Sequence, residues 1–238
     1  MSPKEKKDPI PVVLLVLTLV TGIVDAVSVL TLGHVFTANM TGNVVFLAFA
    51  AAGAPGFSIP RSLTSLVAFM VGAVLGGGLI VRLTGSALRR WFLILIVCEA
   101  ALLFAAAVVS LGAKAESTAP LIPYVVISLT AIAMGLRNAS VRHLAVPDMT
   151  TTVLTLTLTG LAADSSLAGG HNPRIARRGL SVLMMFAGAA GGTVLIRYGS
   201  TVPLLLAGFC VLLSAVLFSR GSTFTSDEML QPAHRKEN

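Results

Sequence analysis

Long apolar runs, separated by short polar and basic stretches, are the feature that most constrains the fold of this chain. Hydrophobic residues make up 55% of the 238 residues and charged residues 11%, and the mean hydropathy is +0.89. A water-soluble protein of this size needs more surface charge, and several runs approach or exceed the roughly 18 residues that suffice for a spanning helix. The chain is therefore predicted to be an all-α integral membrane protein whose main partner is the lipid bilayer.

The chain consists of two similar halves. Residues 22–26 (GIVDA) match 135–139 (GLRNA), Asn39-Met-Thr matches Asp148-Met-Thr, and the glycine-rich stretch 76–82 matches 191–197. Each half contains four apolar segments, at 10–33, 35–52, 63–81 and 91–111, and at 119–140, 145–163, 179–196 and 202–218. We expect a basic N-terminal tail at 1–9, repeats at 10–112 and 113–219, and a polar C-terminal tail at 220–238.

The second segment of each half opens with polar residues and only then becomes apolar. Irregular backbone at membrane depth is stable only where protein or a water-filled cavity covers it. We therefore expect both segments to be broken or re-entrant elements that face the interior. Polar breaks at corresponding places in two apolar halves also indicate the binding site in transporter-like proteins.

The basic residues bear on the number of membrane crossings. If the second segments do not cross, six spanning helices result, and three spans per half invert the second repeat. With both termini in the cytoplasm, all of the 17 Lys and Arg residues except Arg61, Lys114 and Arg197 then lie on the cytoplasmic side. With eight crossings, the pair Arg89 and Arg90 moves outside. The positive-inside rule favours six spans and inverted repeats, and eight spans remain the alternative.

Asp25 lies near the middle of the first apolar helix, where a carboxylate costs at least about 2.5 kcal/mol. It is a candidate proton or cation site, and a structural hydrogen bond is the alternative. Asn138 occupies the matching position in the second half. Arg137 and Arg142 flank Asn138 and are expected to extend to the interface, with pairing to Asp25 or Asp148 as the alternative.

The polar starts of the two second segments complete the candidate substrate site. Half-helices that begin there would direct backbone N–H groups toward the centre, which suits an anionic or polar solute, while side-chain oxygens suit a cation. Helix capping is the alternative explanation. The residues concerned are Asn39, Thr41, Asn43, Asp148, Thr150, Thr151 and Thr152.

Other ionisable groups have simpler interpretations. His34 and His143 match through the repeat, but neither has further ligands at metal spacing, so both are expected to be interfacial residues. Asp164 is expected to be a solvated helix end. Cys98 and Cys210 are expected to be small core residues.

The third segments carry glycines at small-xxx-small spacing, at Gly72 and Gly76 and at Gly188 and Gly192. In lipid this spacing lets two helix backbones approach closely. It indicates packing within the chain or a possible homodimer through these helices.

Several functional classes have little support. The net charge of +7 is spread over short loops and tails, so we expect no nucleic-acid binding. The chain has no nucleophile–base pair, phosphate loop or metal-binding motif, so we expect no enzyme activity, cofactor or metal. A lipid-modifying enzyme using Thr150–Thr152 beside Asp148 is the weakest hypothesis. The leading hypothesis is a small secondary transporter or channel-like protein for a small polar or ionic solute, with a central site at the repeat interface. The alternative is a non-transporting assembly or regulatory subunit.

The motifs GxxDA, VFTANMTGN, GLRNA and DMTTTVLTLTLT resemble the YoaK-like family of bacterial multi-pass membrane proteins, domain of unknown function 1275. The resemblance extends from about Pro11 to Phe218. It implies a location in the bacterial cytoplasmic (inner) membrane and carries over no catalytic residues.

Overall fold

The computed structural model describes residues 9–83, 88–112, 120–144, 151–152, 154–172 and 174–220. Within these ranges the chain forms eight α-helices and no strand, so the predicted all-α class is confirmed. The long helices are α1 (Ile10–Thr31), α3 (Ile59–Arg82), α4 (Leu88–Leu111), α5 (Ile122–Leu144), α7 (Ile175–Ile196) and α8 (Thr201–Arg220). The short ones are α2 (Met40–Ala51) and α6 (Thr155–Ala163), and the 3-10 turn η2 (Ser166–Ala168) follows α6.

Six helices in the described part of the chain are long and apolar enough to cross a membrane. The shortest of them, α8, has 20 residues and is therefore about 30 Å long, which equals the thickness of a typical hydrocarbon core. In contrast, α2 has 12 residues and α6 has nine. Helices α2 and α6 of the second segments are thus too short to span the membrane, which agrees with six crossings.

Local sequence signals explain where the long helices begin. Ser58 caps α3 by accepting a hydrogen bond from the backbone N–H of Arg61, and Pro60 lies in the first turn. Serine and proline favour these positions because the first N–H groups of a helix have no partner within it. As a result, α3 begins at Ile59 rather than at residue 63. Helix α7 also begins earlier than expected, at Ile175 rather than at residue 179, although Arg174 before it makes no side-chain cap.

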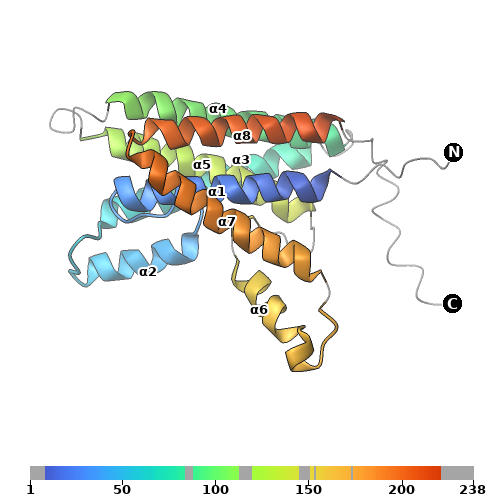
Figure 1. The fold of residues 1–238 in the computed structure, drawn as a ribbon. Coiled ribbons are helices and arrows are strands. Elements are labelled where there is room, and N and C mark those ends of the chain that lie inside the picture. Colours follow the sequence, from blue (N-terminus) through green and yellow to red (C-terminus); the bar gives the residue numbers. More distant parts are fainter. Residues whose placement is uncertain are drawn as a thin grey trace.

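Figure 1 shows α1, α4, α5 and α8 lying alongside one another in a bundle, with α7 crossing α1 at an angle. The main helix pairs are α1 with α7 and α8, α5 with α3 and α4, and α4 with α8. Helix α2 packs on α3, and α6 packs on α7. We match α1, α2, α3 and α4, in this order, with α5, α6, α7 and α8. Each of these helix pairs then has a counterpart under this matching.

Glycines lie at close contacts between helices, and these contacts show the same correspondence between the two halves. A Cβ atom on Gly22 of α1 would overlap the backbone of α7 at Met185, and one on Gly188 would overlap α1 at Leu19. On the other side of the bundle, Gly135 of α5 and Gly72 of α3 approach one another in the same way. The third segments therefore use these glycines for packing within the chain.

These contacts also correct the alignment of the repeats. A Cβ on Gly76 would lie 3.2 Å from the Cα of Leu136, and a Cβ on Gly192 would lie 3.1 Å from the Cα of Ile23. Gly76 thus corresponds to Gly192 in packing, whereas matching the stretches 76–82 and 191–197 pairs it with Gly191. The difference arises because sequence matching maximises identical letters, while packing selects the glycine that faces the partner helix.

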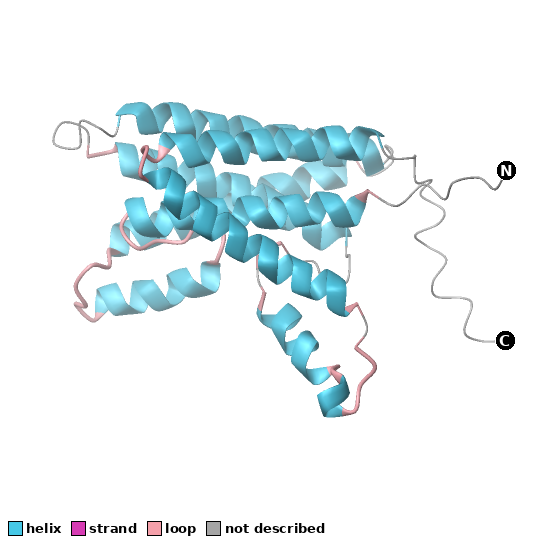
Figure 2. Cartoon of the chain, viewed as in Figure 1, coloured by secondary structure: helices cyan, strands magenta, loops and turns pink. Residues whose placement is uncertain are grey.

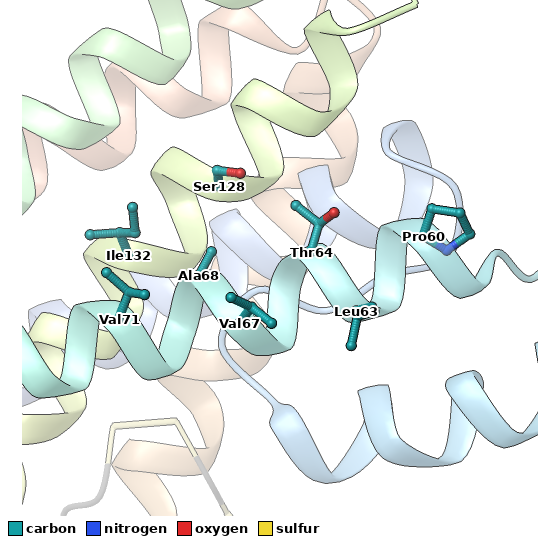
Figure 3. A pocket seen from close by; sticks show the side chains of 8 residues that line it. All are labelled: Pro60, Leu63, Thr64, Val67, Ala68, Val71, Ser128 and Ile132. Atoms are coloured by element: carbon teal, nitrogen blue, oxygen red, sulfur yellow. The ribbon is translucent and has the colours of Figure 1, made fainter.

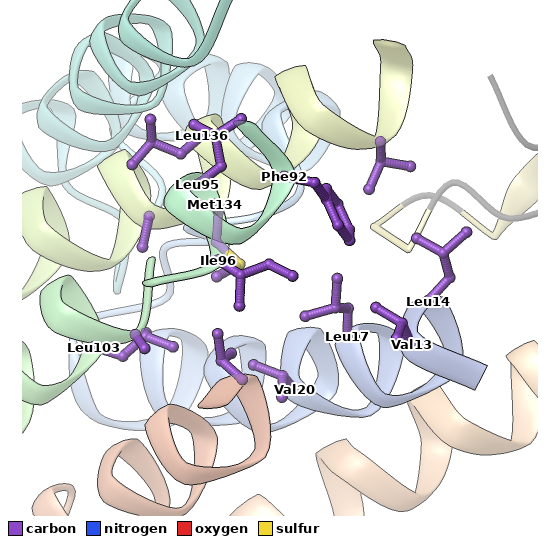
Figure 4. Close-up of a cluster of buried hydrophobic side chains, with 14 of the residues drawn as sticks. Val13, Leu14, Leu17, Val20, Phe92, Leu95, Ile96, Leu103, Met134 and Leu136 are labelled. Atoms are coloured by element: carbon purple, nitrogen blue, oxygen red, sulfur yellow. The ribbon is translucent and has the colours of Figure 1, made fainter. Parts of the chain in front are cut away.

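The bundle interior is apolar and draws on helices of both halves. Figure 4 shows Leu17 and Val20 of α1 in one cluster with Ile96 of α4 and Met134 of α5. All of these side chains are buried. Helix α1 is the most enclosed of the spanning helices, while α3 and α7 are the most exposed.

Apolar side chains cover the outer faces of the bundle, as expected for helices that contact lipid. Val74 of α3 is 73% exposed and Phe186 of α7 is 70% exposed. Helices α2 and α6 lie beside the bundle, on its outside (Figure 2), and expose apolar side chains such as Val44 and Leu156. The expectation that the second segments face the interior is therefore wrong for their helices, because these are apolar on the side away from the bundle.

Candidate functional site

A buried ion pair joins α4 and α5 near the middle of the bundle. Arg137 donates a hydrogen bond from Nη2 to Oε1 of Glu99, and each residue is only 2% exposed. The other terminal nitrogen, Nη1, donates to the carbonyl oxygen of Leu17 and to Oγ1 of Thr21, both at 2.8 Å. One guanidinium group thus connects α5 to α4 and α1.

This pair was missed by the sequence reasoning. Arg137 was expected near the end of a helix closing at residue 140, and therefore at the interface, but α5 continues to Leu144 and Arg137 is buried. The expectation that Arg137 extends to the interface is therefore wrong. A signal for Glu99 was present, because it is the only acidic residue of α4 and lies in the middle of a long apolar run.

Asp25 lies on α1, close to the stretch of chain that follows this helix. The backbone N–H of Ala38 lies close to the Asp25 carboxylate, and Arg137 is near enough for its charge to act on this group. Since α1 ends six residues after Asp25, residues 33–38 run back by about 9 Å along the helix. The carboxylate atom Oδ1 is buried and has no hydrogen-bond partner in the described part of the chain.

The second half has a similar arrangement around Asn138. The hydroxyl group of Thr152 donates to Oδ1 of Asn138 at 2.7 Å, and Nδ2 donates to the carbonyl oxygen of Met134 at 2.9 Å. The chain after α5 therefore also returns along the helix that it has just left. Asn138 thus uses both ends of its amide group, whereas Asp25 has an unused oxygen.

Two threonines with buried, unpartnered hydroxyl groups accompany these contacts. Thr37 precedes Ala38, and Thr151 precedes Thr152; both are 0% exposed, and neither Oγ1 has a partner among the described residues. Thr37 and Thr151 therefore occupy corresponding positions, because each directly precedes the residue that lies against Asp25 or Asn138.

The first polar run holds α2 in place. Asn39 caps α2 by accepting from the N–H of Gly42 at 3.4 Å, so the capping explanation holds for this residue. Buried Asn43 accepts from the N–H of Phe36 at 2.9 Å and donates to its carbonyl oxygen at 2.6 Å and to Ser65 at 3.1 Å. Thr41 is exposed on α2. These three residues lie around α2 rather than around a common centre with Asp25.

The second polar run is described only in part. Asp148 and Thr150 lie outside the described residues. Helix α6 begins at Thr155 after Leu154, which makes no side-chain cap, so this half-helix begins later than the motif suggested. Of the nine predicted site residues, the structure therefore brings Asn138 and Thr152 into contact and places Asp25 next to the Arg137–Glu99 pair.

Other ionisable residues lie away from this cluster. His34 contacts the carbonyl oxygen of Gly56, and His143 packs against Trp91. Asp164 ends α6 and is partly exposed, as expected, but it also accepts a hydrogen bond from Arg178 at 2.7 Å. Cys98 is exposed on the bundle surface, so its expected place in the core is wrong.

A groove of about 550 Å³ lies between α3 and α5. Figure 3 shows its apolar lining, which includes Val67 and Ile132, and its polar groups are the hydroxyls of Thr64 and Ser128. It is open to the outside of the bundle and contains no ionisable residue. We find no group of three or more potential metal ligands in the described ranges.

Comparison with known proteins identifies the family. The chain is 33% identical over 150 residues to the UPF0700 transmembrane protein YoaK of Bacillus subtilis (strain 168). That alignment covers 63% of this chain and 64% of the relative's length. No solved structure matches. The family model described as "Protein of unknown function (DUF1275)" matches residues 13–217, so this multi-pass membrane protein belongs to the DUF1275 family.

Proposed function

We propose that this protein is a small secondary transporter or channel-like protein that moves a small polar or ionic solute across the bacterial cytoplasmic membrane. The observation that carries the proposal is the cluster of Asp25, Glu99 and Arg137 within the spanning helices. Ionisable groups inside a membrane are costly and mark substrate or ion pathways more often than structural positions. Asp25 also retains a buried oxygen with no partner in the described part of the chain, which a solute or ion could use.

The chain path supports a central site. Residues 33–38 return to Asp25 and Thr152 returns to Asn138, so non-helical backbone reaches the depth of the charged cluster from both halves. Backbone of this kind is tolerated where it lines a protein-covered cavity, and it commonly binds solutes in transporters. We therefore propose that both stretches are re-entrant and that Thr37, Thr151 and Thr152 line the solute path.

We also propose that the two halves are inverted repeats. The helix pairs and the glycine contacts have counterparts when the two halves are matched, which supports a two-fold relation between the halves. In Figure 1, α1 begins at the end of the bundle near the N-terminus, whereas α5 begins at the opposite end. Both termini would then lie in the cytoplasm.

A ligand screen followed by flux measurements tests the transport function. Purified protein in detergent is screened by thermal shift against small cations, anions, amino acids and metabolites at two pH values. We expect a ligand that raises the Tm of the wild type by mass action but not that of Asp25→Asn. Proteoliposomes should then accumulate that ligand, while those with the Asp25→Asn protein should not. A stabilising ligand that never crosses the bilayer would contradict transport.

The alternative is a non-transporting membrane subunit. It is supported by buried or partly buried polar side chains that are already hydrogen-bonded within the chain, such as those of Asn43 and Asn138. Cysteine accessibility at Thr37 and Thr151 separates the two functions. A hydrated path exposes both positions to a water-soluble reagent, whereas a dry structural core protects them. Thr41 is unsuitable for this test because it is exposed on the outside of the bundle.

The remaining expectations stay predictions. We expect no enzyme activity and no nucleic-acid partner. A homodimer would pack through glycines that the chain itself does not use, since Gly77, Gly78 and Gly191 have open space where a Cβ atom would lie.

A further inference from the structure

We propose that Asp25 and Thr37 bind one dehydrated alkali-metal ion. This inference deepens the proposed function by naming an ion, and it rests on that function only for the use of the ion in transport. The charge balance of the buried cluster, its unpartnered oxygens and the contrast with the second half support this assignment.

The charges in the cluster do not balance. Asp25 and Glu99 carry two negative charges when ionised, and Arg137 carries one positive charge, which leaves one negative charge. Uncompensated charge in a low-dielectric interior costs several kcal/mol or more. One monovalent cation restores neutrality, whereas a divalent cation would leave a positive charge.

The other elements packed on α1 bring no further cation to Asp25. Helix α7 meets α1 through Gly188 and Gly192, and its basic residues lie at its two ends. Arg220 is at the end of α8. In the returning stretch, His34 is exposed and contacts Gly56. Among the described residues, Arg137 is the cation whose charge acts on Asp25, and it is paired with Glu99.

The unpartnered oxygens are suitable ligands for a metal ion. Oδ1 of Asp25 and Oγ1 of Thr37 are both buried, and neither has a hydrogen-bond partner in the described ranges. An alkali-metal ion uses carboxylate and hydroxyl oxygens as ligands, together with carbonyl groups of non-helical backbone.

The second half provides the contrast. Asn138 replaces the carboxylate with a neutral amide whose two polar ends are already engaged by Thr152 and Met134. That half therefore lacks the charge that an ion needs, and the Asn138 side-chain oxygen is already engaged. We infer one ion per chain, bound on the Asp25 side.

The experiment measures ion binding directly, without transport. The Tm of the purified full-length protein is recorded at constant ionic strength while N-methyl-D-glucamine chloride is replaced by lithium, sodium or potassium chloride. We expect one of these ions to raise the Tm with a saturating dose dependence. Asp25→Asn should abolish the shift, and Thr37→Val should raise the half-saturating concentration about tenfold. Cys98→Ala, which alters an exposed residue on α4, should leave the response unchanged.

Two outcomes would overturn the proposal. One is a Tm that responds equally to all cations in the wild type and in Asp25→Asn. The other is a Tm that depends on pH through Asp25 but not on the identity of the cation, which would indicate a proton. Because ion binding is measured in detergent, it can be present even if proteoliposomes show no solute flux, so the failure of one proposal is distinguishable from the failure of the other.

Discussion

Glu99 on α4 and Arg137 on α5 form a hydrogen-bonded ion pair that is almost completely shielded, in the middle of a bundle of otherwise apolar helices. The same guanidinium group also binds the backbone and a hydroxyl group of α1. Three helices, two from the first half and one from the second, are therefore joined at a single side chain. Polar contacts of this kind fix which helices are neighbours, since apolar helices alone have little preference in lipid.

Breaking this pair on one side should destabilise the protein strongly. Glu99→Gln leaves Arg137 charged without its counter-ion, and removing one partner of a buried pair costs about 3–5 kcal/mol. We expect a large fall in the Tm of the purified protein. The double variant Glu99→Gln, Arg137→Met should be more stable than Glu99→Gln alone because it leaves no buried charge at this place. A double variant that is less stable than the single one would contradict this account.

The contact between Gly22 and Gly188 should tolerate no side chain. Gly22→Ala places a methyl group against the α7 backbone, and overpacking of this kind costs about 1–3 kcal/mol. We expect a lower Tm and a lower yield of folded protein. Gly77→Ala is the matched control, because a Cβ at Gly77 meets nothing within 4 Å. Equal effects of the two substitutions would show that α1 and α7 do not make this contact.

Asn43 should act through the structure rather than through a solute. Asn43→Ala leaves the N–H of Phe36 without its acceptor, at a cost of about 1–3 kcal/mol. We expect faster hydrogen exchange in residues 33–51, because α2 is then held to α3 by fewer contacts. Thr41→Ala, on the exposed side of the same helix, should leave exchange unchanged. A loss of ligand response in Asn43→Ala with unchanged exchange would instead place this residue in the binding site.

The loops that follow α2 and α6 should lie on opposite sides of the membrane if the repeats are inverted. Single cysteines are introduced at Ala52 and Ala168, both exposed, in a protein with Cys98 and Cys210 replaced by serine. In intact cells a membrane-impermeant maleimide should label the cysteine at position 52. The cysteine at position 168 should react only after the membrane is opened. Labelling of both from the same side would refute the inverted arrangement.

Much of the architecture could be predicted from the sequence because its causes are local. The length and hydropathy of each run determine whether a helix can span, and the six long helices agree with this expectation. The polar start of the segment at 35–52 correctly indicated that a helix begins within it, and α2 begins at Met40 with Asn39 as its cap. Asp25 stood out for a similar reason, as a lone carboxylate in an apolar helix.

The tertiary structure alone decided which of these elements meet. Arg137 could be an interfacial residue or half of a buried pair, and the choice depends on Glu99, which lies 38 residues away on another helix. The similar burial of Thr37 and Thr151 likewise depends on how the described chain packs around them. Hydropathy and helix propensity are properties of neighbouring residues, so the sequence by itself determined the helices. Helix pairing depends on shape and charge between distant segments, which become neighbours only when the bundle forms.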